Sequence, residues 1–215
     1  MSVRTLPLDL HADEVTLPAD LLLSDPTRAV VVVAHGSGSS RFSPRNRAVA
    51  EELARSGLGV LLMDLLTETE ARDRRLVFDI PRLGRRLAAL TRTVGGEHLD
   101  PRTPLGYFGA STGAAAALWA AAEPDLRAVI GAIVSRGGRP DLAGTRLAGV
   151  QAPTLLVVGG ADTAVLTLNE QAAKALRCPW DLRVVPGATH LFSEPGALEQ
   201  VASLAVAWFR RHLTP

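Results

Sequence analysis

Apolar positions along this chain alternate between short unbroken runs and stretches in which they recur every three or four residues. The run Ala29–Ala34, which is Ala-Val-Val-Val-Val-Ala, predicts a strand that is covered on both of its faces. The stretch Asn46–Ser56 has helical spacing and ends at Gly57, so it predicts a helix with a glycine stop signal. Repetition of this alternation predicts an α/β fold, with a mostly parallel sheet of about seven or eight strands and helices on both faces.

The other segments continue the same alternation after two N-terminal edge strands arranged as a hairpin. The predicted strands are Arg4–Leu10, Glu14–Leu23, Ala29–Ala34, Gly59–Met63, Leu105–Ala110, Ala128–Val134, Thr154–Val158 and Leu182–Val185. The predicted helices are Asn46–Ser56, Phe78–Thr93, Thr112–Ala122, Asn169–Leu176 and Ala197–His212. Two sizeable connections remain, Leu65–Val77 and the loop Gly137–Val150, which has room for at most a short helix. Neither can form a multi-helix lid, so we expect one domain over residues 1–215 with an open site.

Composition narrows the functional classes. The chain carries 23 basic and 22 acidic residues, a net charge of +1, which gives no argument for nucleic acid or an anionic membrane as partner. Cys178 is the single cysteine, which excludes an intrachain disulfide and a cysteine-rich metal site. The N-terminus lacks the pattern of a secretory signal, and no apolar run reaches the length of a membrane helix. We therefore expect a cytoplasmic protein that needs no cofactor or metal.

A candidate nucleophile lies between a predicted strand and a predicted helix. Gly109-Ala110-Ser111-Thr112-Gly113 matches G-x-S-x-G, in which a sharp turn lifts the serine hydroxyl clear of the sheet edge. Small neighbours two positions away let the backbones pass, and the serine comes to lie at a helix N-terminus. There the backbone N–H of Thr112 can face a developing oxyanion. The motif predicts Ser111 as the nucleophile of a serine hydrolase.

A serine hydroxyl needs a base within hydrogen-bond reach, and the base needs an acid that orients it. Of the two histidines that follow Ser111, His212 lies near the end of the last helix, where a cation interacts well with the helix dipole. His190 follows the strand Leu182–Val185, at the sheet edge where Ser111 also emerges. His190 is therefore the predicted base.

The candidate acids are the carboxylates that follow strands after the nucleophile. Asp162 comes directly after Thr154–Val158 through a tight Gly-Gly-Ala turn, and Asp141 lies further out in the loop after the preceding strand. Glu194 is placed to help cap the last helix, and Asp64 ends a strand that precedes the nucleophile. We predict Asp162 as the acid, with Asp141 as the alternative.

The turn after Ala29–Ala34 should supply the second half of an oxyanion hole. Within His35-Gly36-Ser37-Gly38, the backbone N–H of Ser37 is the expected donor beside that of Thr112, with Gly36 as the alternative. His35 itself is expected to stabilise the turn. Arg41 and Arg136 each follow a strand and are candidate substrate contacts.

With these residues in place, the chain resembles the dienelactone-hydrolase-related branch of the α/β-hydrolases, among serine-nucleophile bacterial enzymes found alone or fused behind phosphoribosyltransferase domains. The resemblance rests on five motifs spread over nearly the whole length: His35–Ser40, Gly109–Gly113, Ser135–Pro140, Gly159–Asp162 and Gly187–His190. It implies the α/β-hydrolase fold, the Ser111–His190–Asp162 triad and the oxyanion turn. Dienelactone hydrolases proper use cysteine as nucleophile, whereas this elbow holds Ser111, so lactone hydrolysis does not carry over directly.

The leading hypothesis is a carboxylic-ester hydrolase that acts on small or exposed esters through an acyl-enzyme. A thioesterase or lactonase with the same triad is the alternative. A nucleotide-binding domain is disfavoured, because Arg41 stands where G-x-G-x-x-G needs its third glycine and no GK[ST] occurs. A non-catalytic scaffold would be expected to lack a member of the triad, and all three members are present.

Overall fold

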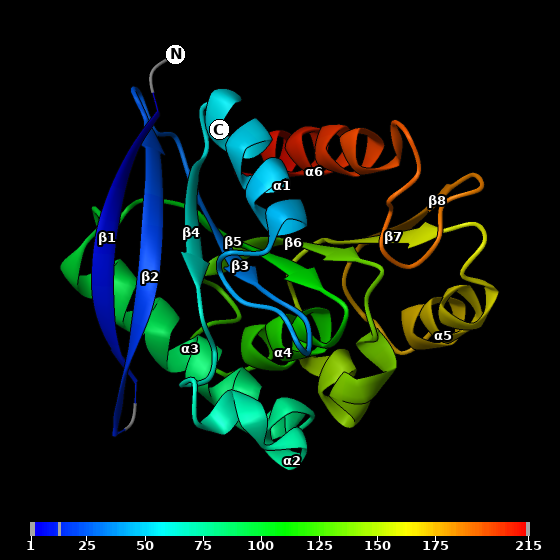
Figure 1. Ribbon diagram of the computed structural model, residues 1–215, viewed down its shortest axis with the longest axis horizontal. Helices are drawn as coiled ribbons and strands as arrows, with labels where there is room; N and C mark the ends of the chain where they lie inside the picture. The colour runs from blue at the N-terminus through cyan, green and yellow to red at the C-terminus, as the bar shows by residue number, and fades with distance from the viewer. Residues whose placement is uncertain (1–2, 13, 214–215) are drawn as a thin grey trace.

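This computed structural model describes residues 3–12 and 14–213 of the chain. All eight strands, from both the N-terminal and the C-terminal parts of the chain, belong to a single sheet (Figure 1). The strand order is β1-β2-β4-β3-β5-β6-β7-β8. β1 pairs antiparallel with β2 and β2 pairs antiparallel with β4, while all other neighbours are parallel. The strands are β1 Val3–Ala12, β2 Val15–Ser24, β3 Val30–Ala34, β4 Gly59–Met63, β5 Leu105–Ala110, β6 Ile130–Arg136, β7 Thr154–Gly159 and β8 Trp180–Val185.

Helices cover both faces of the sheet, as the sequence predicts (Figure 1). α1 (Pro44–Arg55) and α6 (Ala197–Leu213) contact each other on one face. α3 (Ile80–Glu97), α4 (Thr112–Ala121) and α5 (Thr163–Ala173) lie on the other. Within the described part of the chain, no helix combines the length and the apolar character that a membrane crossing needs.

The unbroken valine run in β3 follows from this layering. Val30 and Val32 belong to the hydrophobic cluster beneath α3 and α4, whereas Val31 and Val33 belong to the cluster beneath α1 and α6. Both faces of the strand are buried in apolar clusters, because successive side chains point to opposite faces of the sheet. The parallel strands at the centre of the sheet are therefore fixed by apolar burial on two sides.

The sequence predicted β4 and β5 with the correct bounds, but the bounds of several other elements differ from the prediction. α3 spans Ile80–Glu97 rather than Phe78–Thr93. β6 spans Ile130–Arg136 rather than Ala128–Val134, because Ser135 and Arg136 pair with Gly109 and Ala110 of β5 despite their polarity. α5 begins at Thr163 rather than at Asn169. Asp162 occupies its N-cap position, where aspartate is a preferred residue, but its side chain makes no capping hydrogen bond.

Both long connections contain short helical segments. Glu70–Arg72 forms a 3₁₀ turn and α2 covers Arg74–Val77 within the first connection. In the second, 3₁₀ turns extend over Pro140–Gly149 and break at Gly144, whose φ is 55°. The expected loop there is thus more ordered than the sequence indicated.

Helices α3 and α4 approach each other at Gly84, and this contact gives a test of the fold. A Cβ at Gly84 would lie 2.4 Å from Cε3 of Trp119, so Gly84→Ala must push the indole away. We expect a loss of about 1–3 kcal/mol in the free energy of unfolding, measured by urea denaturation. Gly96→Ala, in the same helix with no heavy atom within 4 Å of the new Cβ, is the matched control and should stabilise by up to about 1 kcal/mol. Equal effects of the two substitutions on the free energy of unfolding would contradict the close packing of Gly84 against Trp119.

Candidate functional site

Ser111 lies at the junction of β5 and α4 in a backbone conformation that few L-residues adopt, with φ 51° and ψ −121°. Two backbone hydrogen bonds hold the turn. The Ser111 N–H donates to the Arg136 carbonyl at 3.2 Å, and the Arg139 N–H donates to the Ser111 carbonyl at 3.1 Å. The unusual φ and ψ are thereby fixed by the neighbouring strand and its following loop.

Three glycines allow this turn to form. A Cβ on Gly113 would lie 2.2 Å from the Ala34 carbonyl oxygen, and one on Gly109 would lie 2.4 Å from Cα of Ala114. A Cβ on Gly36 would lie 2.9 Å from Cβ of Ser111. The strand–turn–helix unit and the turn after β3 therefore touch backbone to backbone, which larger residues would prevent.

His190 and Asp162 are joined directly, as the sequence predicts. Nδ1 of His190 lies 2.7 Å from Oδ2 of Asp162, and the two side chains are 39% and 16% exposed. A carboxylate on Nδ1 leaves Nε2 of the neutral ring as the free nitrogen. A backbone contact supports the geometry, since the Ala161 N–H donates to the Ala188 carbonyl at 2.9 Å.

Ser111 and His190 are brought to the same edge of the sheet through the end of β6. Ser111 is hydrogen-bonded to the backbone of Arg136, and a Cβ on the next residue, Gly137, would lie 3.6 Å from Cε1 of His190. Among the described residues, the Ser111 hydroxyl makes no hydrogen bond to His190.

The two residues predicted to form the oxyanion hole are in contact. The Ser37 N–H donates to the Thr112 hydroxyl oxygen at 2.8 Å, and Thr112 is buried. Thr112 is the first residue of α4, so its own N–H has no acceptor within the helix. An anion bound between the two amides would therefore replace the Thr112 hydroxyl as the acceptor of the Ser37 N–H. The sequence did not indicate this role for the Thr112 side chain.

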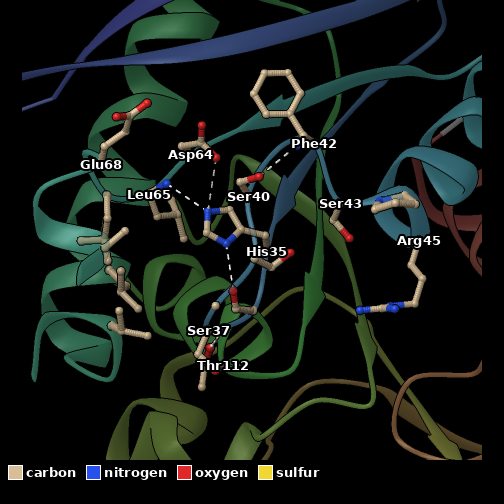
Figure 2. Close-up of a pocket in the computed structure, with 18 residues that line it drawn as sticks. His35, Ser37, Ser40, Phe42, Ser43, Arg45, Asp64, Leu65, Glu68 and Thr112 are labelled. Carbon is tan, nitrogen blue, oxygen red and sulfur yellow. Dashed lines mark hydrogen bonds and ion pairs between the residues drawn. The ribbon is translucent and has the colours of Figure 1, made fainter. Parts of the chain in front are cut away.

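His35 stabilises the turn after β3, as expected. Its Nε2 accepts a hydrogen bond from the Leu65 N–H at 3.3 Å, so the proton of the neutral ring is on Nδ1, which donates to the Gly36 carbonyl at 2.9 Å (Figure 2). Burial lowers the pKa of His35, although the Gly36 hydrogen bond and the Asp64 carboxylate oppose that shift. The neutral imidazole thus links the turn after β3 to the turn after β4.

A cavity of about 620 Å³ opens beside this turn, next to Ser37 and Thr112 (Figure 2). Its apolar wall comes from the segment after β4 and from α3, and Phe42, which is 59% exposed, lies at its rim. The wall segment is held by Glu70, which bonds Arg86 at 2.6 and 3.0 Å and whose pKa is lowered to about 2 by that contact. The cavity has the size and the mixed lining of a small-molecule site.

Several other predicted residues have partners of their own. Arg41 donates through its backbone N–H and its guanidinium to Asp64, and its guanidinium stacks 4.0 Å from the centre of the Phe42 ring. Asp141 accepts two hydrogen bonds from Arg139, at 2.9 and 2.7 Å, rather than contacting His190. Glu194 accepts from the Thr189 hydroxyl at 2.6 Å. Arg41 is therefore engaged with the protein, and Asp141 lacks the contact that Asp162 makes.

Arg136 differs from these residues, because it is buried with no partner for its Nε and Nη1 atoms. Cys178 is also buried, but its thiol contacts Thr154 and lies outside the candidate site. Over the described ranges 3–12 and 14–213, no cluster of three or more His, Cys, Asp or Glu side chains could hold a metal ion.

Comparison with known proteins places the chain among relatives of this architecture, although no family model matches it. The crystal structure of a dienelactone hydrolase from Anabaena variabilis is 47% identical, covers 98% of this chain and 99% of its own, and superimposes with a TM-score of 0.94. Est1E from Butyrivibrio proteoclasticus shares the fold at 18% identity, with coverage of 95% and 98% and a TM-score of 0.78.

Two curated relatives from Mycobacterium tuberculosis strains, both named putative phosphoribosyl transferase, are 54% identical over 211 residues. The match covers 98% of this chain but 47% of theirs. The chain thus spans about half the length of these relatives.

The neutral state of His35 predicts a loss of stability on acidification. An unfolded histidine has a pKa of about 6.5, whereas the pKa of His35 in the folded chain is lower, so below that pH the unfolded chain binds a proton that the folded chain does not. Between the two pKa values the free energy of unfolding should fall by up to about 1.4 kcal/mol per pH unit. Urea denaturation above and below that pH should show a weaker pH dependence in His35→Asn than in the wild type.

The matched control is His98→Asn, which removes a histidine at the end of α3, outside the turn after β3. An unchanged pH dependence in His35→Asn would contradict the neutral assignment.

Proposed function

This chain belongs to the dienelactone hydrolase family of α/β-hydrolases, and from that membership we propose that it hydrolyses carboxylic esters of small or exposed substrates through an acyl-enzyme on Ser111. The observation that carries the proposal is the convergence of three residues at one sheet edge. Ser111 occupies a strained turn there, and His190 lies 2.7 Å from Asp162 at the same edge. This is the arrangement that activates a serine hydroxyl.

In the proposed reaction, Nε2 of His190 takes the Ser111 proton as Oγ forms a bond to the ester carbonyl carbon. Asp162 holds the ring in the tautomer with the proton on Nδ1 and stabilises the imidazolium that forms. The tetrahedral oxyanion accepts hydrogen bonds from the Thr112 and Ser37 amides. When the intermediate collapses, the C–O bond to the alcohol breaks and His190 returns the proton to the leaving oxygen. Water then attacks the acyl-enzyme by the same steps and releases the acid.

The oxyanion step has a structural requirement in this chain. The Ser37 N–H donates to the Thr112 hydroxyl oxygen, so this hydroxyl must rotate away for the Ser37 N–H to donate to the oxyanion. A neutral acceptor is then exchanged for an anionic one, and hydrogen bonds to charged acceptors are about twice as strong. The exchange favours the transition state over the ground state, which is the condition for catalysis.

Lactone or thioester hydrolysis with the same residues is the second candidate. The observation in its favour is the identity of 47% with a protein named dienelactone hydrolase. The serine nucleophile favours open carboxylic esters. Comparing p-nitrophenyl esters of graded chain length with thioesters and lactones as substrates separates the two candidates.

Replacement of the nucleophile tests the mechanism. Ser111→Ala should lose covalent labelling by a fluorophosphonate probe and lower ester hydrolysis at least about a thousandfold, because the hydroxyl that attacks in the proposed reaction is removed. Ser203→Ala, which removes an exposed serine of α6, should retain labelling and rate. Persistent labelling of the Ser111→Ala protein would refute the assignment.

The acid is tested against its alternative. Asp162→Asn should lower kcat by about 10³- to 10⁴-fold with little change in KM, because the amide stabilises the wrong tautomer of His190. Stability should hardly change, since the Asp162 side chain does not cap α5. Asp141→Asn, which weakens the contact with Arg139, should stay within about tenfold of wild type, or about 1.4 kcal/mol in barrier. The opposite ranking of the two variants would make Asp141 the acid.

A further inference from the structure

Arg136 is a buried cation without an anion. It is the last residue of β6 and is 7% exposed, and its Nε and Nη1 atoms are buried with no hydrogen-bond partner. No ion pair to Arg136 is formed by any residue in the ranges 3–12 and 14–213. Its carbonyl accepts the Ser111 N–H at 3.2 Å, so the backbone of Arg136 is adjacent to that of the candidate nucleophile.

A second unpaired arginine lies nearby. Arg45, in the first turn of α1, lines the cavity, and its Nε is buried without a partner. Figure 2 shows Arg45 on the side of the cavity opposite Glu68. Burial and repulsion from Arg45 lower the pKa of Arg136 to about 10, so Arg136 remains cationic at neutral pH. The first turn of α1 contains no acidic residue, and its helix dipole adds positive potential.

Arg86, the other deeply buried arginine, has a carboxylate partner. Arg86 is 3% exposed, and its guanidinium bonds both carboxylate oxygens of Glu70 and the Leu65 carbonyl. A buried charge is strongly unfavourable unless it is paired and hydrogen-bonded. Arg136 therefore has the desolvation cost of a buried cation without the partner that offsets it in Arg86. A bound anion would supply that partner.

We propose that Arg136 and Arg45 form a subsite for a phosphate-type dianion carried by the substrate, next to the ester bond cleaved at Ser111. The subsite deepens the proposed function and rests on it for the reaction, but anion binding can be measured separately. Two guanidinium groups without a carboxylate carry two positive charges. A dianionic phosphate group neutralises both, whereas a carboxylate leaves one uncompensated, and arginine's planar donors suit phosphate oxygens.

The first test measures binding without catalysis. Inorganic phosphate is titrated calorimetrically into the Ser111→Ala protein at about pH 8, where phosphate is mostly dianionic. We expect saturable binding, weakened about ten- to a hundredfold by adding either Arg136→Gln or Arg45→Gln. Arg136→Lys, which keeps the positive charge, should lose less phosphate affinity than Arg136→Gln. Arg45→Gln keeps the test decisive if the Arg136 variants do not fold, because Arg45 is less buried.

The matched control is Arg47→Gln, which removes a positive charge from the same helix. Arg47 is paired with Asp20 at 3.0 Å, so its loss should leave phosphate affinity within about twofold. An equal loss of phosphate affinity in all three Gln variants would show that phosphate responds to the general positive potential of this region rather than to a specific site, and would overturn the proposal.

The second test compares aryl esters that differ only in a neutral, carboxylate or phosphate tail. The wild type should have the highest kcat/KM for the phosphate tail, and the ratio of phosphate to neutral ester should fall at least about tenfold in Arg45→Gln but not in Arg47→Gln. A preference for the carboxylate tail, or no preference, would overturn the subsite.

The two proposals fail in different ways. Hydrolysis of neutral esters with labelling at Ser111, but without phosphate binding, would leave the function and remove the subsite. Phosphate binding that depends on Arg136 and Arg45, without any ester hydrolysis, would leave the anion site and remove the function.

Discussion

The close approach of two backbones at the elbow determines the geometry of the whole site. α4 begins so near the end of β3 that Gly113 leaves no room for a Cβ against the carbonyls of Ala34 and His35. The same approach places the Ser37 amide beside Thr112 and the Gly36 backbone beside Ser111. The candidate nucleophile and the candidate oxyanion donors are therefore positioned by close contacts between the turn after β3 and the first residues of α4. Such contacts need little reorganisation during a reaction, which is what electrostatic stabilisation of a transition state requires.

Beyond the turn at Ser111, a series of polar contacts fixes the segments that line the cavity. His35 connects the turn after β3 to the backbone of Leu65, and Asp64 in the same turn anchors Arg41. The wall of the cavity continues to Glu70, which Arg86 fixes. Each contact is between residues distant in sequence, and the contacts of His35 and Asp64 lie at the carboxyl ends of parallel strands, where open α/β sheets place their binding sites. The cavity is thus built from the same edge that presents Ser111 and His190.

Local patterns predicted the parts of the fold whose causes are local. β4 and β5 are apolar runs bounded by turn residues, so their bounds followed from the sequence. The start of α5 was missed although Asp162, a residue type that often caps helices, stands directly before it in the sequence. In the structure the Asp162 carboxylate contacts His190 and makes no capping hydrogen bond. The residue type alone therefore does not show whether a side chain caps its own helix or contacts a histidine distant in the sequence.

For the two candidate substrate arginines, the sequence does not show which guanidinium is paired in the folded chain. Arg41 and Arg136 both follow strands that lead to the site, and nothing in their neighbours distinguishes them. In the structure Arg41 is bound to Asp64, whereas Arg136 is buried and unpaired. The difference depends on which residues the fold brings near each guanidinium, and a one-dimensional pattern does not contain it. Since a folded chain normally pairs the charges it buries, the unpaired cation indicates where the protein is complete only with a ligand.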